Sequence, residues 1–201
     1  MTSVTEYDYQ SDRYVLRPGV GAEQVDGVAL GLGWELVREI PRDKDEGVDG
    51  QLIWLGAGDV SLHYVVDATS GIGYVLLAGP SRPAVEPFVG PVVDRLRPWT
   101  LPELFELLDE ADQPRERVRN TLRIGLAASA EFDKEVFRRI SGTYTDGEDQ
   151  VRLAGLWAAT YTGYRQFLPQ IREIASHDQV EWIRSRAESI AAAFESEDDA
   201  R

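Results

Sequence analysis

The sequence predicts an α+β protein in which a small antiparallel-sheet domain precedes a superhelical stack of three helical pairs. In the first half, short apolar runs are separated by Gly-containing turns, as in antiparallel strands. In the second half, a Val-Arg or Ile-Arg step recurs at Val118, Val151 and Ile183, and each step opens an Ala- and Leu-rich segment. A repeat of this length is typical of stacked helical pairs. We expect domains at 1–99 and 100–195, followed by an acidic tail at 196–201.

The composition limits the classes of function. The chain has 201 residues, no Cys and a net charge of −14, so it can bury a sizeable core without disulfides. An acidic protein repels phosphate backbones, and the Arg residues are interleaved with acids, so we expect no nucleic-acid partner. The acidity has two readings that remain open, namely solubility and attraction to a basic partner.

The N-terminal sequence predicts a cytoplasmic protein. It lacks the basic region and apolar run of a signal peptide. No apolar stretch approaches the roughly 20 residues that a membrane span needs. We therefore expect neither export nor membrane insertion.

The elements of the N-terminal half follow from apolar periodicity and breaker residues. Tyr7, Tyr9 and Tyr14 alternate loosely enough for an edge strand, and Pro18-Gly19 ends the strand that follows. Val60, Leu62, Tyr64 and Val66 repeat every second residue, which predicts a strand with one buried face. The expected strands are 13–17, 34–40, 51–55, 60–66 and 71–78, and the expected helices are 22–32 and 85–96.

The short Gly-containing breaks between the last three strands suit hairpins, so these strands are predicted to form an antiparallel meander. Pro98-Trp99-Thr100 marks the seam between the two halves. The C-terminal half then predicts six helices in three pairs: 101–110 with 115–128, 132–141 with 149–162, and 165–175 with 180–194.

The repeated steps carry a resemblance to a known family. An acid precedes Val151-Arg152, with Ala and Leu following at fixed offsets, and Asp178 similarly precedes Ile183-Arg184. This pattern resembles the short HEAT-like repeats also found in phycobilisome lyases, and it covers residues 100–195. The resemblance implies an α-α superhelix, and we expect each repeated Arg to pair with acids of the adjacent turn. The predicted ladder is Val118, Arg119, Val151, Arg152, Ile183 and Arg184.

Candidate catalytic groups are few. His63 falls in a predicted strand and His177 in a turn, with no His-x-x-x-His or His-Glu pair, so no metal site or cofactor is predicted. HEAT-like hydroxylases use His-Glu pairs for iron, and HEAT-like DNA glycosylases present basic residues, so the resemblance favours neither activity. Gly19-Val20-Gly21 is interpreted as a turn rather than a phosphate loop, because acids follow it closely.

The exposed positions of the repeats suggest a binding surface. Trp157 lies six residues after its step, where the family pattern is variable and faces away from the core. The hypothesis is an apolar patch of Ile124, Leu153, Trp157 and Tyr161. The alternative is that Trp157 packs in the core or under the N-terminal domain.

The sequence therefore predicts a non-catalytic protein-protein interaction module with a HEAT-like scaffold and a protein partner. One alternative is an acidic immunity-type inhibitor of a basic toxin or nuclease, and another is a chromophore-handling enzyme of the lyase type.

Overall fold

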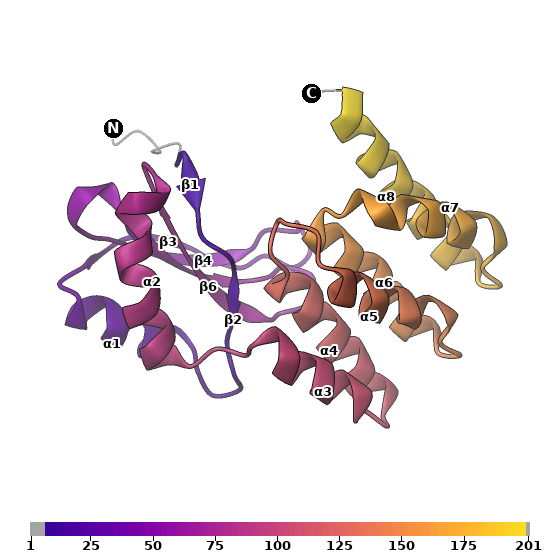
Figure 1. Ribbon diagram of the computed structural model, residues 1–201, viewed down its shortest axis with the longest axis horizontal. Coiled ribbons are helices and arrows are strands. Elements are labelled where there is room, and N and C mark those ends of the chain that lie inside the picture. Colours follow the sequence, from indigo (N-terminus) through magenta and orange to yellow (C-terminus); the bar gives the residue numbers. More distant parts are fainter. Residues whose placement is uncertain (1–6, 200–201) are drawn as a thin grey trace. The chain divides into compact units, whose positions relative to one another are not determined.

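The computed structural model describes residues 7–199 and shows an α+β protein (Figure 1). An antiparallel sheet with two helices is followed by a region of packed helices, as the sequence predicts. The chain divides into two compact units, Met1–Thr100 and Leu101–Arg201.

The first unit is built on a six-stranded antiparallel sheet of order β1-β6-β5-β4-β3, in which β2 also pairs with β6. The predicted meander is confirmed, because β3, β4, β5 and β6 pair consecutively. The strands are β1 Tyr9–Gln10, β2 Tyr14–Val15, β3 Glu35–Ile40, β4 Gly50–Leu55, β5 Ser61–Val66 and β6 Gly73–Gly79, and the short helix η1 is Ala57–Asp59.

Two helices, α1 (Ala22–Gly31) and α2 (Arg82–Leu96), pack on the sheet, and their buried side chains form one core with those of the central strands. Helix α2 begins before the predicted residue 85 and contains two internal prolines. Pro83, Pro87 and Pro91 are spaced four apart and all are exposed. Water can therefore satisfy the carbonyl groups that lose a helical donor, while Val85 and Val92 on the opposite side hold the helix to the core.

The second unit consists of packed helices. Helix α4 runs along α6, α7 packs against α8, and α3 packs on α4. The helices are α3 Leu101–Asp109, α4 Pro114–Ala127, α5 Lys134–Gly142, α6 Asp149–Thr162, α7 Leu168–His177 and α8 Glu181–Asp199, with short helices η2 Thr143–Thr145 and η3 Arg165–Phe167. Since α8 continues to Asp199, the predicted tail is helical as far as that residue, and 200–201 lie outside the described residues.

Repeated Arg–Asp contacts link the successive turns of this unit. Arg117 Nε and Nη2 donate to the Asp146 carboxylate at 2.9 and 3.2 Å, and Arg152 binds Asp178 in the same two-point manner at 2.7 and 3.0 Å. Arg117 and Arg152 also donate through Nη1 to the Asp112 and Asp146 carbonyls, which precede their own helices. Arg184 makes the same kind of bond to the Asp178 carbonyl. The expected pairing of Arg with neighbouring turns is thus observed for Arg152.

The first rung differs from the predicted one. Arg119 is exposed, and the ion pair with the next turn is made by Arg117. Val118 is only half-buried, whereas Val151 and Ile183 are fully buried. The physical reason is register: α4 begins at Pro114, so Arg117, like Arg152 and Arg184, stands three residues after its helix start.

Candidate partner-binding groove

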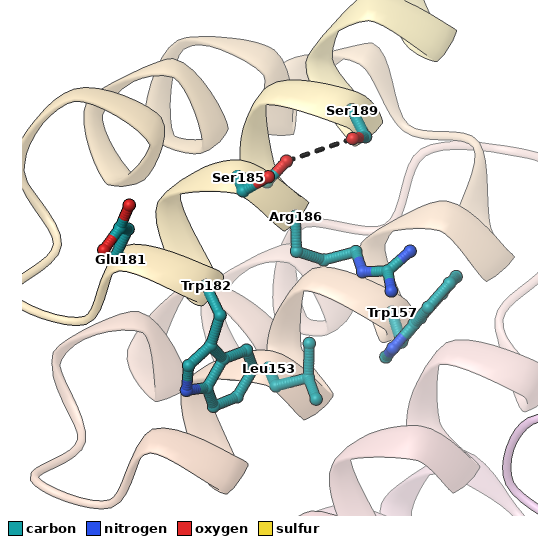
Figure 2. Close-up of a pocket in the computed structure, with 7 residues that line it drawn as sticks. All are labelled: Leu153, Trp157, Glu181, Trp182, Ser185, Arg186 and Ser189. Carbon is teal, nitrogen blue, oxygen red and sulfur yellow. Dashed lines mark hydrogen bonds between the residues drawn. The ribbon is translucent and has the colours of Figure 1, made fainter.

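Helices α6 and α8 form the walls of an open groove of about 660 Å³. Its lining combines two indole rings, one aliphatic side chain and one guanidinium group with smaller polar residues (Figure 2). The residues are Leu153, Trp157, Glu181, Trp182, Ser185, Arg186 and Ser189. We call this set the tryptophan groove.

Helix periodicity explains how the side chains converge. Leu153 and Trp157 lie four residues apart in α6, and Trp182 and Arg186 lie four apart in α8, so each pair occupies one face of its helix. The two helices are in contact, which brings both faces to one groove. On α8 the lining also includes the small side chains of Ser185 and Ser189, and the Ser189 hydroxyl donates to the Ser185 carbonyl at 3.0 Å.

The electrostatics of the groove centre on Arg186. Its guanidinium carbon lies 5.2 Å from the centroid of the Trp157 ring, and Figure 2 shows the side chain extended toward that indole. This distance permits a cation–π interaction. Among the side chains described, those of residues 7–196, no carboxylate forms an ion pair with Arg186, and Glu181 stands apart from it in Figure 2.

Five arginines of the second unit differ from Arg186 in being ion-paired. Arg117, Arg138, Arg139, Arg152 and Arg172 each form an ion pair with an Asp or Glu. The donors of Arg186 therefore remain available to a carboxylate or carbonyl oxygen from outside the chain. Trp182, which is 43% exposed, offers an indole beside that charge.

The structure brings together two of the four predicted interface residues. Leu153 and Trp157 line the tryptophan groove and are half-buried, so Trp157 is not a core residue. Tyr161, one turn further along α6, is also half-buried but does not line the groove.

The prediction for Ile124 is wrong, because its side chain is fully buried. The starts of α4 and α6 lie 35 residues apart, but the burial patterns further along the two helices match at an offset of 34 residues, not the 33 of the Val-Arg step. By burial, the position equivalent to Trp157 is Arg123. The two helices also approach closely here. A Cβ atom on Gly125 would lie 2.6 Å from the Ala158 Cα, and Ile124 is adjacent to that contact.

Sequence reasoning missed Trp182 and Arg186. The signal that could have found them is the repeat itself, since Ser189 is the third-repeat equivalent of Trp157. Arg186 lies one helical turn before Ser189 in α8, and Trp182 lies one turn before Arg186. The predicted patch combined residues of α4 and α6, whereas the groove forms between α6 and α8.

Ser61 and His63 form a buried polar pair in β5. Ser61 Oγ lies 2.8 Å from His63 Nε2, and burial lowers the pKa of His63 to about 4, so its imidazole is neutral. Ser61 is fully buried, and a hydroxyl without exposure cannot meet a substrate. We interpret this pair as part of the packing of β5.

In residues 7–199 no group of three or more His, Cys, Asp or Glu side chains is placed to hold a metal ion. Within the same residues, none of the helices combines the length and apolar character of a membrane span.

Comparisons with models of known protein families, with curated proteins and with solved structures find no match to this chain.

Proposed function

We propose that this chain is a non-catalytic protein-protein interaction module that uses the tryptophan groove to bind a protein partner. The observation that carries the proposal is the placement of Arg186 between Trp157 and Trp182, without an acidic partner among the side chains of residues 7–196. Trp and Arg are the side chains most often found as binding anchors, because they combine large contact area with directional donors. The anchor on the partner is an apolar side chain with a carboxylate or carbonyl oxygen beside it.

The helical unit is the scaffold of this module, and we propose that it is a short HEAT-like array of three helical pairs. The repeated contact between an Arg and the turn of the next pair supports this interpretation, since the same interaction recurs at Arg117 and Arg152. Contacts of α4 with α6 and of α6 with α8 link the second helices of successive pairs. A helical pair in such an array buries its apolar face only by stacking on its neighbours.

The partner is a protein in the cytoplasm rather than a nucleic acid or a membrane. The net charge of −14 opposes binding to phosphate backbones and to anionic lipid surfaces. No cofactor enters the proposal, because the binding energy comes from the groove side chains.

The test is affinity capture from the native organism with the full chain and three variants. Trp157→Ala and Trp182→Ala remove one indole each from the groove, and Leu30→Ala removes an exposed apolar side chain from α1 as a matched control. A stoichiometric protein is identified by capture with the wild type, purified, and titrated against all four proteins by calorimetry. We expect each Trp variant to weaken binding about tenfold or more, and Leu30→Ala to leave it unchanged.

Folding of each variant is checked by circular dichroism and thermal unfolding, so that loss of binding is separated from loss of structure. A purified partner that binds the folded Trp157→Ala and Trp182→Ala variants as tightly as the wild type would contradict the proposal.

An acidic inhibitor of a basic toxin or nuclease is the second candidate, and the net charge of −14 favours it. The two candidates differ in salt dependence. Binding through acidic surface weakens steeply as ionic strength rises, whereas anchoring by the indoles changes little. Titrating the purified partner at low and high salt distinguishes them.

A further inference from the structure

Strand β3 forms a long free edge of the sheet. It stands at the end of the strand order and pairs only with β4, and in the described part of the chain its residues make no other backbone ladder. The opposite edge of the sheet is covered by β1 and β2, which are two residues long each. Short edge strands leave little template for another chain, so β3, with six residues, is the edge able to accept one.

The side chains around this edge are unusually exposed. Every residue of β3 from Glu35 to Glu39 is exposed, and Ile40 is half-buried. Seven large apolar residues are exposed in the described structure, and four of them lie on the β3–β4 hairpin. They are Leu36 at 50%, Val37 at 56%, Val48 at 40% and Leu55 at 38%.

These apolar groups lie on both faces of the edge. Leu36 stands opposite Trp54, and its neighbour Glu35 stands opposite Leu55. Since successive residues of a strand point to opposite faces, Leu36 and Leu55 belong to different faces of the sheet. A strand added along β3 would cover apolar surface on both sides, as well as the outer backbone groups.

The charges on the hairpin identify the kind of strand that fits. Glu35 and Glu39 lie on β3, and three more acids follow at the hairpin tip: Asp43, Asp45 and Glu46. Three bases stand against these five acids, namely Arg38, Lys44 and Arg42, and the Arg42 guanidinium is held by the Asp67 and Ala68 carbonyls. The hairpin surface is therefore net acidic. Opposite charges on adjacent strands attract, so a strand bearing Lys or Arg is favoured.

A second copy of this chain is the poorer occupant. A symmetric antiparallel pair centred on Val37 places Glu35 opposite Glu39, and one centred on Arg38 places Arg38 opposite itself. Like charges facing each other across strands are destabilising. The register shift between Leu36 and Arg38 also bends the edge, which is a device that discourages pairing between identical edges.

We propose that β3 is a docking edge that binds an extended, basic segment of a partner protein by strand addition, with apolar side chains alternating with Lys or Arg. Main-chain hydrogen bonds to the outer edge of β3 provide the attachment, and the charge pattern provides the selection. This surface is separate from the tryptophan groove and does not depend on it.

The experiment titrates the ¹⁵N-labelled full chain with three blocked hexapeptides and follows the amide resonances. The first peptide alternates Lys and Val, the second alternates Glu and Val, and the third is the Lys peptide with its central Val replaced by Pro. We expect only the first to shift the amides of residues 35–40. Proline lacks the backbone donor and therefore blocks strand addition while it preserves the peptide's charge.

Variants test the charge selection. Glu35→Lys with Glu39→Lys is compared with Glu110→Lys with Glu188→Lys, which makes the same change in net charge at exposed positions of the second unit. The first double variant is expected to bind the Lys-Val peptide about tenfold more weakly, and the second to bind within about twofold of the wild type. The Trp157→Ala variant should bind this peptide normally, which separates this proposal from the one for the groove.

Three results would overturn the proposal. Equal shifts with the Lys-Val and the proline peptides would show general attraction without strand addition. Absence of shifts in β3 at millimolar peptide would show that the edge does not pair. Concentration-dependent dimers whose β3 amides are protected from exchange without peptide would show that the occupant is a second copy.

Discussion

Arg152 and Asp178 form a two-point ion pair in which both side chains are only 5% exposed. Arg152 comes from the start of α6 and Asp178 from the turn before α8, so the ion pair fixes α6 to the turn between α7 and α8. The same turn is held a second time, because Arg184 donates to the Asp178 carbonyl at 2.6 Å. Asp178 thus receives an Arg from each side.

Replacing Arg152 by Met should destabilise the protein by about 3–5 kcal/mol, since Asp178 would be left as a buried charge without its partner. Arg184→Ala removes one hydrogen bond to a carbonyl and should cost about 1 kcal/mol. Urea unfolding followed by circular dichroism measures both. Equal losses of unfolding free energy for the two variants would show that the buried ion pair contributes no more to stability than one hydrogen bond to a carbonyl.

Two helical glycines should respond in opposite directions to the same substitution. Gly125→Ala places a Cβ 2.6 Å from the Ala158 Cα and should cost about 1–3 kcal/mol, because α4 and α6 must separate. Gly27→Ala adds a methyl group to the exposed side of α1, where no atom lies within 4 Å, and should stabilise by about 0.5–1 kcal/mol. Thermal unfolding gives the sign of each change. A neutral Gly125→Ala would mean that the two helices are not in close contact.

Ile124 and Leu153 differ in burial, so truncating each to Ala tests which of the two belongs to the core. Ile124→Ala should cost about 2–5 kcal/mol, because this side chain is fully buried. Leu153→Ala should cost about 1 kcal/mol, since half-burial in the groove leaves part of its surface in water. Chemical denaturation of both variants compares them directly. Similar costs at both positions would place Ile124 at the surface, contrary to the structure.

Stability should fall as the pH drops from about 6.5 to 4 because of His63. Burial lowers the pKa of His63 from 6.5 to about 4, so over this range the unfolded chain binds a proton that the folded chain does not. The stabilisation is fully present above pH 6.5, and about 3 kcal/mol is lost by pH 4. His63→Gln keeps a polar group near Ser61 but cannot titrate, so its stability should be flat over the same range. Unfolding at pH 7.5, 5.5 and 4.5 measures the difference.

A separate loss is expected at lower pH from the ion-paired acids. The hydrogen bond from Arg152 lowers the pKa of Asp178 below its usual 3.8, so its contribution is present above that value and disappears as pH falls through the lowered pKa. This second loss should shrink in Asp178→Asn, because Asp146 and Glu135 also have lowered pKa values and still contribute to it, and it should persist unchanged in His63→Gln. A single pH transition removed by either variant alone would contradict this division.

The positions of helices and strands were largely predictable because their signals are local. Alternation from Val60 to Val66 indicated β5, and breaks such as Ser176-His177-Asp178 marked helix ends. α6 was predicted at its observed bounds, Asp149–Thr162. The predicted helix 85–96 is shorter than α2, because a proline within a helix removes a backbone donor and therefore argues against helix from sequence alone. Only the fold shows that Pro83, Pro87 and Pro91 share the exposed side.

The candidate site was predictable only in part. The repeat pattern pointed to Leu153 and Trp157, but a one-residue change of register places Ile124 in the core and gives the half-buried position to Arg123. The facing wall, Trp182 and Arg186, comes from another helix, and its position across the groove depends on how α8 packs on α6.

The sequence by itself determined the order and type of the elements, because helical and strand periodicity are written in residues a few positions apart. Tertiary structure alone decided which side chains meet, namely Arg152 with Asp178, Arg117 with Asp146, and Arg186 with Trp157. A helix shifted by one residue turns its side chains by about 100°. Neighbours across helices therefore depend on packing between distant segments, which a local pattern does not specify.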